Sequence, residues 1–585
     1  MFSVGDKLEK TNSLFAQRYP GLAFLINMEE RECSEYVDEK EAAIALAKQY
    51  CPKDADIIYV FGLHVSDCFY AYKSWLEAND MRHLVFLDFD MSAIHGFLST
   101  SAALDILNHP RVHIRVPLSP DRIEEVVCEC AQTFPIEKVL FAPSQRYVEK
   151  HKELVEKLTS LVYAQTTQQH ALLQEGVYYH LFFRNFLKNI EFQQNAFIAN
   201  KLKGRFDGVP AIICGAGPSL EKDLSALKKL YSKALIISAG SAITALSRSQ
   251  TKFHMAIALD PNDEEVRRFK ENVVFETVLI YVNRLHSDVF TTLNTSLGHL
   301  QAESGGELEK AVIEALDIKS EALAEGFGQE AMSVTTTALE LATTMGCNPI
   351  ILAGVDLAYT GNARYLPGVI EGTGFDLESD KQEMRCSEKL VLAEDIWKNP
   401  IYTLSKWEME SEGIAKFAEH NKQTTYLNAT QGGIGVKGVK NIDLEKILFE
   451  NSWDIEGMLD VSRECLIKDV GNKKALEALK KQWHASFLEG EELCKKALER
   501  LDVLGDKLCE EDGRLVYLDF IFQDLEMYKV FFKQSDQAFK DSIALRSSYT
   551  RFEETLLHAE SIKKEALYQF WQSRLHVVQF LAESF

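Results

Sequence analysis

Residues Ala211–Leu220 read AIICGAGPSL, a short apolar run followed by glycine, proline and serine. The run Ala211–Cys214 is typical of a buried strand. Gly215 and Gly217 allow backbone angles that other residues avoid, and Pro218 suits the first turn of a helix. Leucines at helical spacing then follow from Leu220. The stretch therefore predicts a strand, a glycine turn and a helix.

Such a turn can bind an anion, because the first N–H groups of a helix have no partner within the helix. The alternative is an ordinary tight turn between a strand and a helix, and two glycines alone do not decide between them. If an anion binds, we expect Gly217→Val to abolish binding and to leave the fold intact. The candidate ligand-binding residues are Gly215, Ala216, Gly217, Pro218 and Ser219.

Composition narrows the class of protein. A chain of 585 residues is too long for one hydrophobic core, so several domains are expected. The net charge of −23, from 87 acidic and 64 basic residues, argues against binding nucleic acid through bulk charge. The cysteines form no CxxC pair, so no zinc site is expected. The N-terminus has no signal-peptide core and no apolar run spans a bilayer, which predicts a cytoplasmic protein.

Residues 1–180 read as an α/β domain with a parallel sheet. Apolar runs alternate with helical patterns, which is the arrangement of a Rossmann-like fold. The stretch VFGLHVSD, followed by Asp88 or Asp90 after the next strand, is placed like a nucleotide-binding unit. Its turn holds only Gly62, so we favour a scaffold without a nucleotide. The four expected strands are Asp56–Leu63, His83–Phe89, Val112–Val116 and Lys138–Phe141.

Residues 181–450 form the predicted functional core. Ligands of an open parallel sheet bind beyond the carboxyl ends of its strands, and several expected strands here end in small or polar residues. Ser238 and Ser241 follow one strand, and Asp260 and Asp356 each follow another. Either carboxylate taken alone is better explained as a helix cap or turn residue, but not when it is taken together with the GAGPS turn. The expected strands are Ala211–Cys214, Ala234–Ser238, Met255–Leu259, Thr277–Tyr281 and Pro349–Ala353.

Residues 451–585 are rich in Leu, Glu, Lys and Ala, which predicts a helical bundle. The stretch Leu515–Phe532 is apolar on nearly all sides, so a buried helix is expected there.

Four motifs in the core carry a resemblance to a known family. They are CGAGPSLEKDL, ALDPND, SVTTTALELATTMGCNPIILAGVDLAYTG and YLNATQGGIGVKGVKNIDLEKI, in this order within Phe206–Ile447. Together they resemble the motility accessory factor family of bacterial flagellin glycosyltransferases. The core is also similar to 6-hydroxymethylpterin pyrophosphokinase-like proteins and to bacterial lipooligosaccharide sialyltransferases. The resemblance implies a Rossmann-like N-terminal domain, a doubly wound sialyltransferase-like core and a helical C-terminal region.

The resemblance also implies an activity and a set of site residues. A nonulosonic acid such as pseudaminic or legionaminic acid would pass from a CMP-activated donor to Ser or Thr of a surface protein such as flagellin. The turn from Gly215 to Ser219 would hold the donor phosphate, Ser333 would lie near the nucleotide, and Asp356 and Tyr359 would lie beside the sugar. The histidine that the sialyltransferases use as a base has no counterpart between Asp356 and Tyr402.

The base is therefore unassigned, with Asp356 and Asp260 as the carboxylate candidates. Two other functions stay open: an ATP-using pyrophosphokinase-like enzyme, with Asp260, Asp263 and Asp356 on metal ions, and a non-catalytic binding protein. For the transferase we expect no cofactor and no metal, since the CMP-sugar is a substrate. The expected partners are the nucleotide sugar and an acceptor protein.

Overall fold

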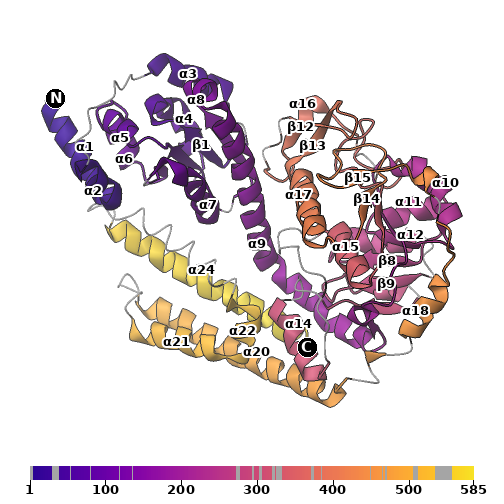
Figure 1. Cartoon of the computed structure of the whole chain (residues 1–585). Helices are drawn as coiled ribbons and strands as arrows, with labels where there is room; N and C mark the ends of the chain where they lie inside the picture. Colours follow the sequence, from indigo (N-terminus) through magenta and orange to yellow (C-terminus); the bar gives the residue numbers. More distant parts are fainter. Residues whose placement is uncertain are drawn as a thin grey trace. The chain divides into compact units, whose positions relative to one another are not determined.

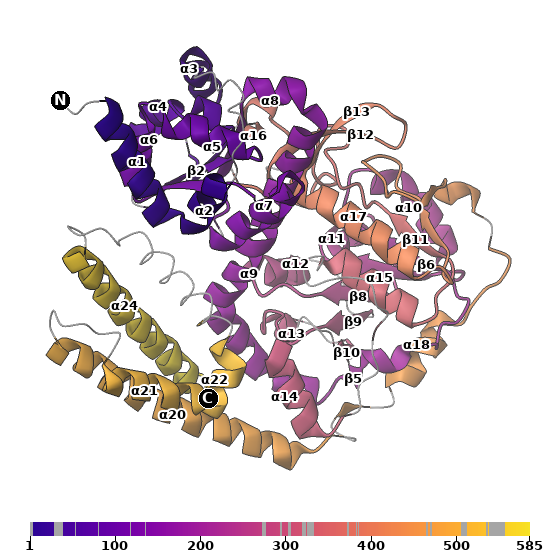
Figure 2. The same ribbon diagram turned by 60° about the vertical axis from the view of Figure 1, so that its left-hand side comes forward.

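Figures 1 and 2 show the computed structural model of the whole chain. It describes residues 4–28, 39–52, 54–79, 81–117, 119–134, 136–271, 277–292, 295–301, 306–318, 323, 333–370, 374–381, 383, 385–447, 449–463, 466–467, 471–504, 512–533, 536 and 556–585. Two compact units are distinguished, and each is described by itself. Unit 1 comprises Met1–Gln174, Lys381–Lys389 and Lys540–Ile562, and unit 2 comprises Glu175–Asp380, Leu390–Phe539 and Lys563–Phe585. The division at 180 and 450 stays a prediction.

Unit 1 is built on a four-stranded parallel sheet in the order β3-β2-β1-β4. All four expected strands are confirmed, because each is a continuous apolar run that is buried on both faces of the sheet. Their bounds are Ile57–Phe61 for β1, His83–Leu87 for β2, Val112–Arg115 for β3 and Val139–Pro143 for β4.

Helices cover both faces of this sheet. Ile58 and Phe86 pack in a core with the helices of one face, and their chain neighbours Ile57 and Leu87 pack in a second core on the other. The helices are α1 Val4–Arg18, α2 Pro20–Met28, α3 Lys40–Gln49, α4 Cys68–Glu77, α5 Met91–Leu98, α6 Ala103–Asn108, α7 Ile123–Thr133, α8 Gln145–Lys150 and α9 Lys152–Gln193. The last of these continues past the boundary into unit 2.

Unit 2 is built on a nine-stranded parallel sheet in the order β15-β14-β11-β6-β7-β8-β9-β10-β5. The five expected strands are β6 Ala211–Cys214, β7 Leu235–Ala239, β8 Met255–Ala258, β9 Val278–Tyr281 and β11 Ile350–Ala353. Four short strands escaped the sequence analysis: β5 Phe197–Ile198, β10 Leu297–His299, β14 Tyr426–Asn428 and β15 Lys440–Asn441. From β6 the chain first builds outward through β7 to β10 and later returns to add β11 on the other side. The strand order therefore reverses between β6 and β11.

Helices also lie on both sides of this sheet, and Figure 1 shows α15 and α17 on one side and α10, α11 and α12 on the other. α15 contacts β6, β7, β8 and β11. The bounds are α10 Leu220–Leu230, α11 Ala242–Arg248, α12 Asp263–Glu271, α13 Val289–Thr292, α14 Gly306–Leu316, α15 Val334–Thr344, α16 Leu377–Asp380, α17 Ser405–His420 and α18 Ile455–Arg463. An antiparallel hairpin of β12 Leu390–Glu394 and β13 Pro400–Leu404 stands apart from the sheet.

The C-terminal part is helical, as its composition predicts. Its helices are α20 Lys473–Leu504, α21 Gly513–Asp524, α22 Glu526–Phe531 and α24 Leu556–Glu583. The prediction of one buried helix over Leu515–Phe532 is wrong: two helices meet at Leu525, and Val516, Tyr517 and Phe520 are exposed. The described part of the chain includes no helix with the length and apolar character needed to cross a bilayer.

Candidate functional site

The glycine turn lies at the switch point of the nine-stranded sheet, where ligands of such folds bind. β6 ends at Cys214 and α10 begins at Leu220, so the strand, turn and helix have the predicted order. The Gly217 N–H donates to the Gly354 carbonyl at 2.8 Å. A Cβ at Gly215 would lie 2.5 Å from the same carbonyl oxygen. Glycine is therefore required here by the close approach of the chain that leaves β11.

Asp356 lies against this turn. The Ser219 hydroxyl donates to Asp356 Oδ1 at 2.6 Å, and the Ser219 N–H donates to Oδ2 at 3.2 Å. Burial raises the pKa of Asp356, and the bond from Ser219 opposes that rise. Asp356 is 2% exposed. A buried carboxylate thus occupies part of the space that the sequence analysis left for an anion.

This arrangement corrects the expected outcome of Gly217→Val. A Cβ at Gly217 would lie 2.6 Å from Asp356 Cγ and 2.7 Å from the Gly354 carbonyl oxygen. Real Cβ atoms do not approach backbone or buried groups so closely. The substitution would disturb the turn itself, so it cannot test anion binding separately from folding.

A second glycine-rich segment packs on the other side of Asp356. The Ile434 N–H donates to the Asp356 carbonyl at 3.1 Å. A Cβ at Gly433 would collide with that same carbonyl, and one at Gly432 would lie 2.6 Å from Thr360 Cγ2. The Val355 N–H donates to Thr430 Oγ1 at 3.2 Å. The sequence TQGGIG therefore holds the chain around Asp356, a role that sequence reasoning did not assign to it.

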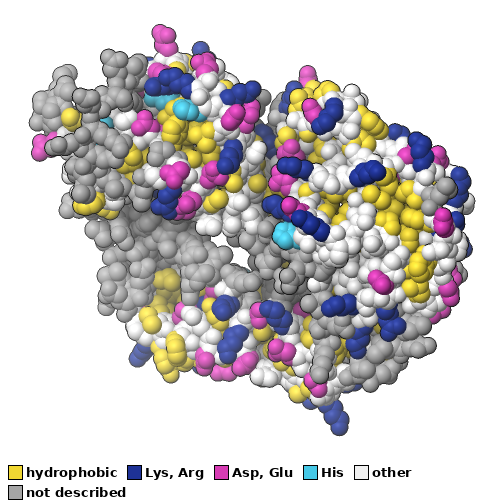
Figure 3. All heavy atoms as spheres, viewed as in Figure 1, with side chains coloured by type: hydrophobic (Ala, Val, Ile, Leu, Met, Phe, Trp, Pro, Cys, Tyr) yellow, Lys and Arg dark blue, Asp and Glu magenta, His cyan; other side chains and the backbone are white. Residues whose placement is uncertain are grey.

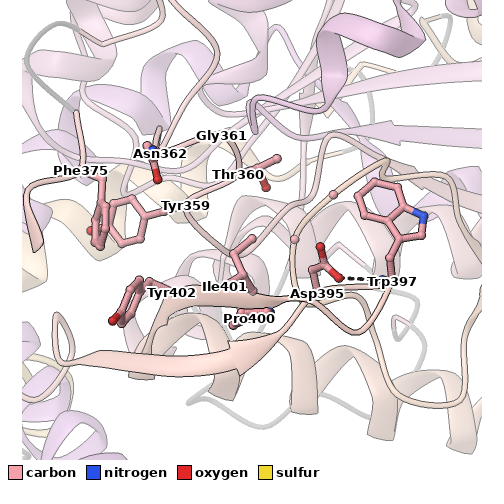
Figure 4. Close-up of a pocket in the computed structure, with 12 residues that line it drawn as sticks. Tyr359, Thr360, Gly361, Asn362, Phe375, Asp395, Trp397, Pro400, Ile401 and Tyr402 are labelled. Carbon is pink, nitrogen blue, oxygen red and sulfur yellow. Dashed lines mark hydrogen bonds between the residues drawn. The ribbon is translucent and has the colours of Figure 1, made fainter.

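A cavity of about 420 Å³ opens beside Asp356. It lies between the chain that follows β11, the β12–β13 hairpin and the second glycine segment (Figure 4). Its lining residues are Tyr359, Thr360, Gly361, Asn362, Phe375, Asp395, Trp397, Pro400, Ile401, Tyr402, Gly432 and Gly433. Tyr359, predicted as a site residue, is thus brought to the cavity.

Aromatic rings form one wall of the cavity. The ring of Phe375 lies 4.7 Å from that of Tyr359 and 5.3 Å from that of Tyr402, measured between centroids. Trp407, from α17, packs against Tyr359 at 5.4 Å, and the Arg364 guanidinium lies 5.1 Å from the Trp407 ring. Figure 4 shows the rings of Tyr359, Phe375 and Tyr402 grouped together, with Asp395 and Trp397 on the opposite side of the cavity.

The first turn of α10 carries a second buried carboxylate. The Gln431 amide donates to Asp223 Oδ1 at 3.1 Å, and the Lys222 ammonium donates to the Gln431 carbonyl at 3.3 Å. Burial raises the pKa of Asp223 to about 7, with the nearby charges of Asp443 and Asp356 acting in the same direction. Asp223 Oδ2 has no hydrogen-bond partner among the described residues. Sequence reasoning missed Asp223, since its spacing is that of an ordinary helix residue.

The serines predicted for this site take different positions. Ser238, near the end of β7, is fully buried, and its hydroxyl has no partner in the described part of the protein. Ser241 precedes α11 and is half-buried. Ser333 caps α15 through the Thr336 N–H, and its hydroxyl donates to Glu410 Oε1 at 2.6 Å. Burial raises the pKa of Glu410. Sequence reasoning did not identify Glu410 as a residue of this site.

Asp260 follows β8 and lies away from the turn of β6 in the strand order. It is half-buried, and its carbonyl accepts from the His286 N–H at 3.1 Å. Arg268 lies near Asp260. Burial lowers the pKa of Arg268, and the charges of Asp260 and Tyr365 oppose that fall. His420, the next histidine after Asp356, is exposed at the end of α17.

Amide side chains of α9 close the other half of the carboxyl edge. The Asn189 amide donates to the carbonyls of Asn283 and Leu285 at 2.9 and 2.6 Å. The Asn283 amide in turn donates to Gln193 Oε1 at 3.0 Å, and the Asn185 amide donates to the Pro261 carbonyl at 3.4 Å. Asn185, Asn189 and Gln193 recur every four residues on one face of α9. These bonds hold α9 against the segments that follow β8 and β9, away from the glycine turn and Asp356.

Unit 1 has a turn of the same kind after β1, but it is filled. Asp88 accepts from the Leu63 N–H at 2.8 Å and from the Tyr147 hydroxyl at 2.8 Å. A Cβ at Gly62, whose φ is +129°, would lie 2.6 Å from His64 Cε1 and 2.9 Å from Ser144 Oγ. The His64 imidazole thus occupies the space over the turn.

The carboxylates proposed for metal binding are not gathered. Asp263 is exposed and pairs with His286 at 3.2 Å, whereas Asp356 is buried at the glycine turn. In the described ranges, no group of three or more His, Cys, Asp or Glu side chains has an arrangement suited to a metal ion.

The parallel sheet, its covering helices and the turn at the switch point define an α/β protein with a candidate site at the carboxyl edge. Residues 184–362 match a family model described as 6-hydroxymethylpterin diphosphokinase MptE-like. The structure is similar to that of the MAf glycosyltransferase from Magnetospirillum magneticum AMB-1, with a TM-score of 0.51 and 12% sequence identity. That similarity covers 99% of this chain and 97% of the other. No curated protein matches the chain in sequence.

The two comparisons confirm the resemblance that the motifs carry. The whole chain has a fold similar to that of a motility accessory factor glycosyltransferase, and its core matches the pterin diphosphokinase-like model in sequence.

Proposed function

We propose that this protein is a glycosyltransferase of the motility accessory factor type. It transfers a nonulosonic acid, such as pseudaminic or legionaminic acid, from a CMP-activated donor to Ser or Thr of a surface protein such as flagellin. The observation that carries the proposal is the junction of the glycine turn, Asp356 and an aromatic cavity at the switch point of the sheet. The fold similarity to a MAf glycosyltransferase supports it.

The chemistry assigns two tasks to these residues. A hydroxyl of the acceptor attacks the anomeric carbon, the bond to the donor phosphate breaks, CMP departs, and the hydroxyl proton passes to a base. The N-terminus of α10 carries the positive end of the helix dipole, which would stabilise the departing phosphate. Asp356 is the proposed base. Burial raises its pKa toward neutral pH, and a base works best when its pKa is close to the working pH. Asp260 is the second carboxylate candidate.

The nucleotide is proposed to lie along β7 and the start of α15. Ser238 offers a buried hydroxyl without a described partner. Ser241 stands at the start of α11, and Ser333 presents its hydroxyl together with the Glu410 carboxylate. These groups suit the hydroxyls of a ribose and the polar edge of a base.

The test is a thermal-shift screen of the full chain with CMP, CTP, ATP and with GDP and UDP sugars, each with and without Mg²⁺. A ligand present well above its dissociation constant stabilises the folded state by about 2–4 kcal/mol. We expect the cytidine nucleotides CMP and CTP to raise the melting temperature without Mg²⁺. Stabilisation by none of the cytidine nucleotides would reject the proposal.

The sequence match to a diphosphokinase model favours one second candidate, an enzyme that transfers diphosphate from ATP. Such an enzyme needs metal ions on the phosphates, and the carboxylates predicted to hold them, Asp260, Asp263 and Asp356, are not gathered in the structure. The same screen separates the two functions, since this candidate predicts stabilisation by ATP that depends on Mg²⁺.

A further inference from the structure

The cavity beside Asp356 has a charge pattern that the proposed donor does not match. Among the described residues that line it, Asp395 is the one with a charged side chain. Although partial burial raises the pKa of Asp395, hydrogen bonds from Asn399 and from the Trp397 N–H lower it overall, so the group is ionised at neutral pH. None of the described lining residues is a Lys or Arg that could pair with the phosphate and carboxylate of a CMP-activated nonulosonic acid. The cavity therefore suits another part of the reaction.

The hairpin keeps Asp395 and Trp397 in fixed positions at the cavity edge. Asp395 Oδ1 accepts from the N–H groups of Trp397 and Asn399, both at 2.8 Å, which closes the turn between β12 and β13. Trp397 is 57% exposed on this turn. Figure 3 shows hydrophobic side chains on the surface over β12 and β13. An exposed indole held at the rim of an aromatic cavity is typical of a recognition surface.

The cavity is also close to the proposed reaction centre. Its lining residues Gly432 and Gly433 pack directly on Thr360 and on the Asp356 backbone. The Lys222 ammonium, on the first turn of α10, lies 5.7 Å from the Trp397 ring. Lys222 therefore lies near the Trp397 side of the cavity, whereas Arg364 lies behind the aromatic wall, over the ring of Trp407.

We propose that this cavity is the acceptor subsite. It binds an uncharged stretch of the acceptor polypeptide that carries the Ser or Thr hydroxyl, with Trp397 packing on that stretch and Asp395 excluding acidic neighbours. The inference rests on the proposed transferase function and adds to it the location and chemistry of acceptor recognition. Negative selection by a fixed charge is a common source of specificity.

The test uses the full chain and two short peptides. One has a central Thr between uncharged residues, and the other has Glu on both sides of the Thr. Calorimetry should show tighter binding of the uncharged peptide, and Asp395→Asn should bring the two affinities together. Trp397→Ala should weaken the uncharged peptide by about tenfold, the size of a recognition hot spot. Leu392→Ala is the matched control, since Leu392 is exposed on the same hairpin and does not line the cavity.

CMP affinity is measured on the same variants. Under the proposal, Trp397→Ala lowers peptide affinity at least ten times as much as CMP affinity. Equal losses of both would place the donor in the cavity and overturn the proposal, as would a peptide affinity that Trp397→Ala leaves unchanged. If the peptides bind as expected but no CMP-sugar is hydrolysed or transferred, the transferase function fails while the peptide site stands.

Discussion

Each of the two parallel sheets of this protein has a glycine-containing turn that donates a backbone N–H to a buried aspartate, and the two turns differ in what lies next to them. In unit 1, Asp88 from the end of β2 accepts the Leu63 N–H of the turn after β1. In unit 2, Asp356 from the end of β11 accepts the Ser219 N–H of the turn after β6. Both carboxylates are buried, and burial raises the pKa of both.

The difference lies in the space over the turn. His64 fills it in unit 1 and is itself buried, with Nε2 lacking a partner among the described residues. In unit 2 a cavity of about 420 Å³ lies next to Gly432 and Gly433, which pack against Thr360 and the backbone of Asp356. A glycine turn over a parallel strand therefore does not by itself mark a site. Whether such a turn belongs to a site depends on whether neighbouring side chains fill the space next to it.

The largest expected effect comes from filling the turn of unit 2. Gly217→Val should place its Cβ 2.6 Å from Asp356 Cγ and 2.7 Å from the Gly354 carbonyl. Because backbone atoms cannot move aside, the loss should exceed about 5 kcal/mol and reach the exceptional range for single substitutions. Hydrogen exchange should show lost protection in β6 and β11, with β1–β4 of unit 1 unchanged.

Gly374→Val serves as the control for that experiment. No atom lies within 4 Å of a Cβ at Gly374, so the protection of β6 and β11 should be retained. Full protection of β6 in Gly217→Val would show that the turn has more room than the structure gives it.

The strands and the place of Asp356 were predictable, and the closing contacts were not. Each long strand is a continuous apolar run, whereas β5, β14 and β15 have two or three residues and carry no readable pattern. Asp356 follows a strand, and parallel strands end at a shared edge, which brings it near the turn. Asp223, Gln431 and Glu410 gain their positions from contacts between distant segments.

The error over residues 515–532 has a related cause. An apolar pattern on all sides predicts burial, but α21 packs through Leu515 and Phe522 while Val516, Tyr517 and Phe520 remain exposed. Composition alone does not tell how many faces of a helix have a neighbour.

The two turns should respond to pH in opposite directions. Burial, together with Arg146 and Lys150, lowers the pKa of His64 to about 4, so unit 1 loses stability as pH falls from about 6.5 to 4. Burial raises the pKa of Asp223 to about 7, so unit 2 loses stability as pH rises from about 4 to 7. Each effect is on the order of 3–4 kcal/mol over its full window.

Variants isolate these two groups from the other titrating side chains. His64→Phe should flatten the pH dependence of exchange in β1, and Asp223→Asn should flatten that in β6. The comparison is between each variant and the wild type across pH 4–8. If either variant keeps the wild-type slope, the corresponding group titrates in the folded protein as it does in the unfolded chain.

Asp356→Asn should remove the negative charge at the turn while keeping the hydrogen bonds that hold the turn in place. Ser219 offers a hydroxyl that can accept as well as donate, so an asparagine can bond to both groups of Ser219 and the fold should be retained. Without a base, turnover of the CMP-sugar should fall about 100-fold or more, which corresponds to about 2.7 kcal/mol. Steady-state hydrolysis of the donor gives the measurement, and activity within a few-fold of wild type would contradict a catalytic role for Asp356.

The same substitution in unit 1 should have the smallest effect and a different character. Four donors surround Asp88: the N–H groups of Leu63, Phe89 and Asp90 and the hydroxyl of Tyr147. An asparagine oxygen can keep those on Oδ1, but its amide then faces the Leu63 N–H as a second donor. We expect Asp88→Asn to cost about 2 kcal/mol of stability, the usual loss for a buried hydrogen bond to a charged group.

The readout that completes the comparison is donor hydrolysis by Asp88→Asn at a temperature where the variant is folded. His64 fills the turn of unit 1, so Asp88 contacts other groups of the protein and no ligand. Turnover should therefore stay within about twofold of wild type. Chemical unfolding followed by hydrogen exchange in β1 and β2 measures the stability loss. A variant that is fully stable but turns over donor 100-fold more slowly would reverse the assignment and make the turn of unit 1 part of the reaction.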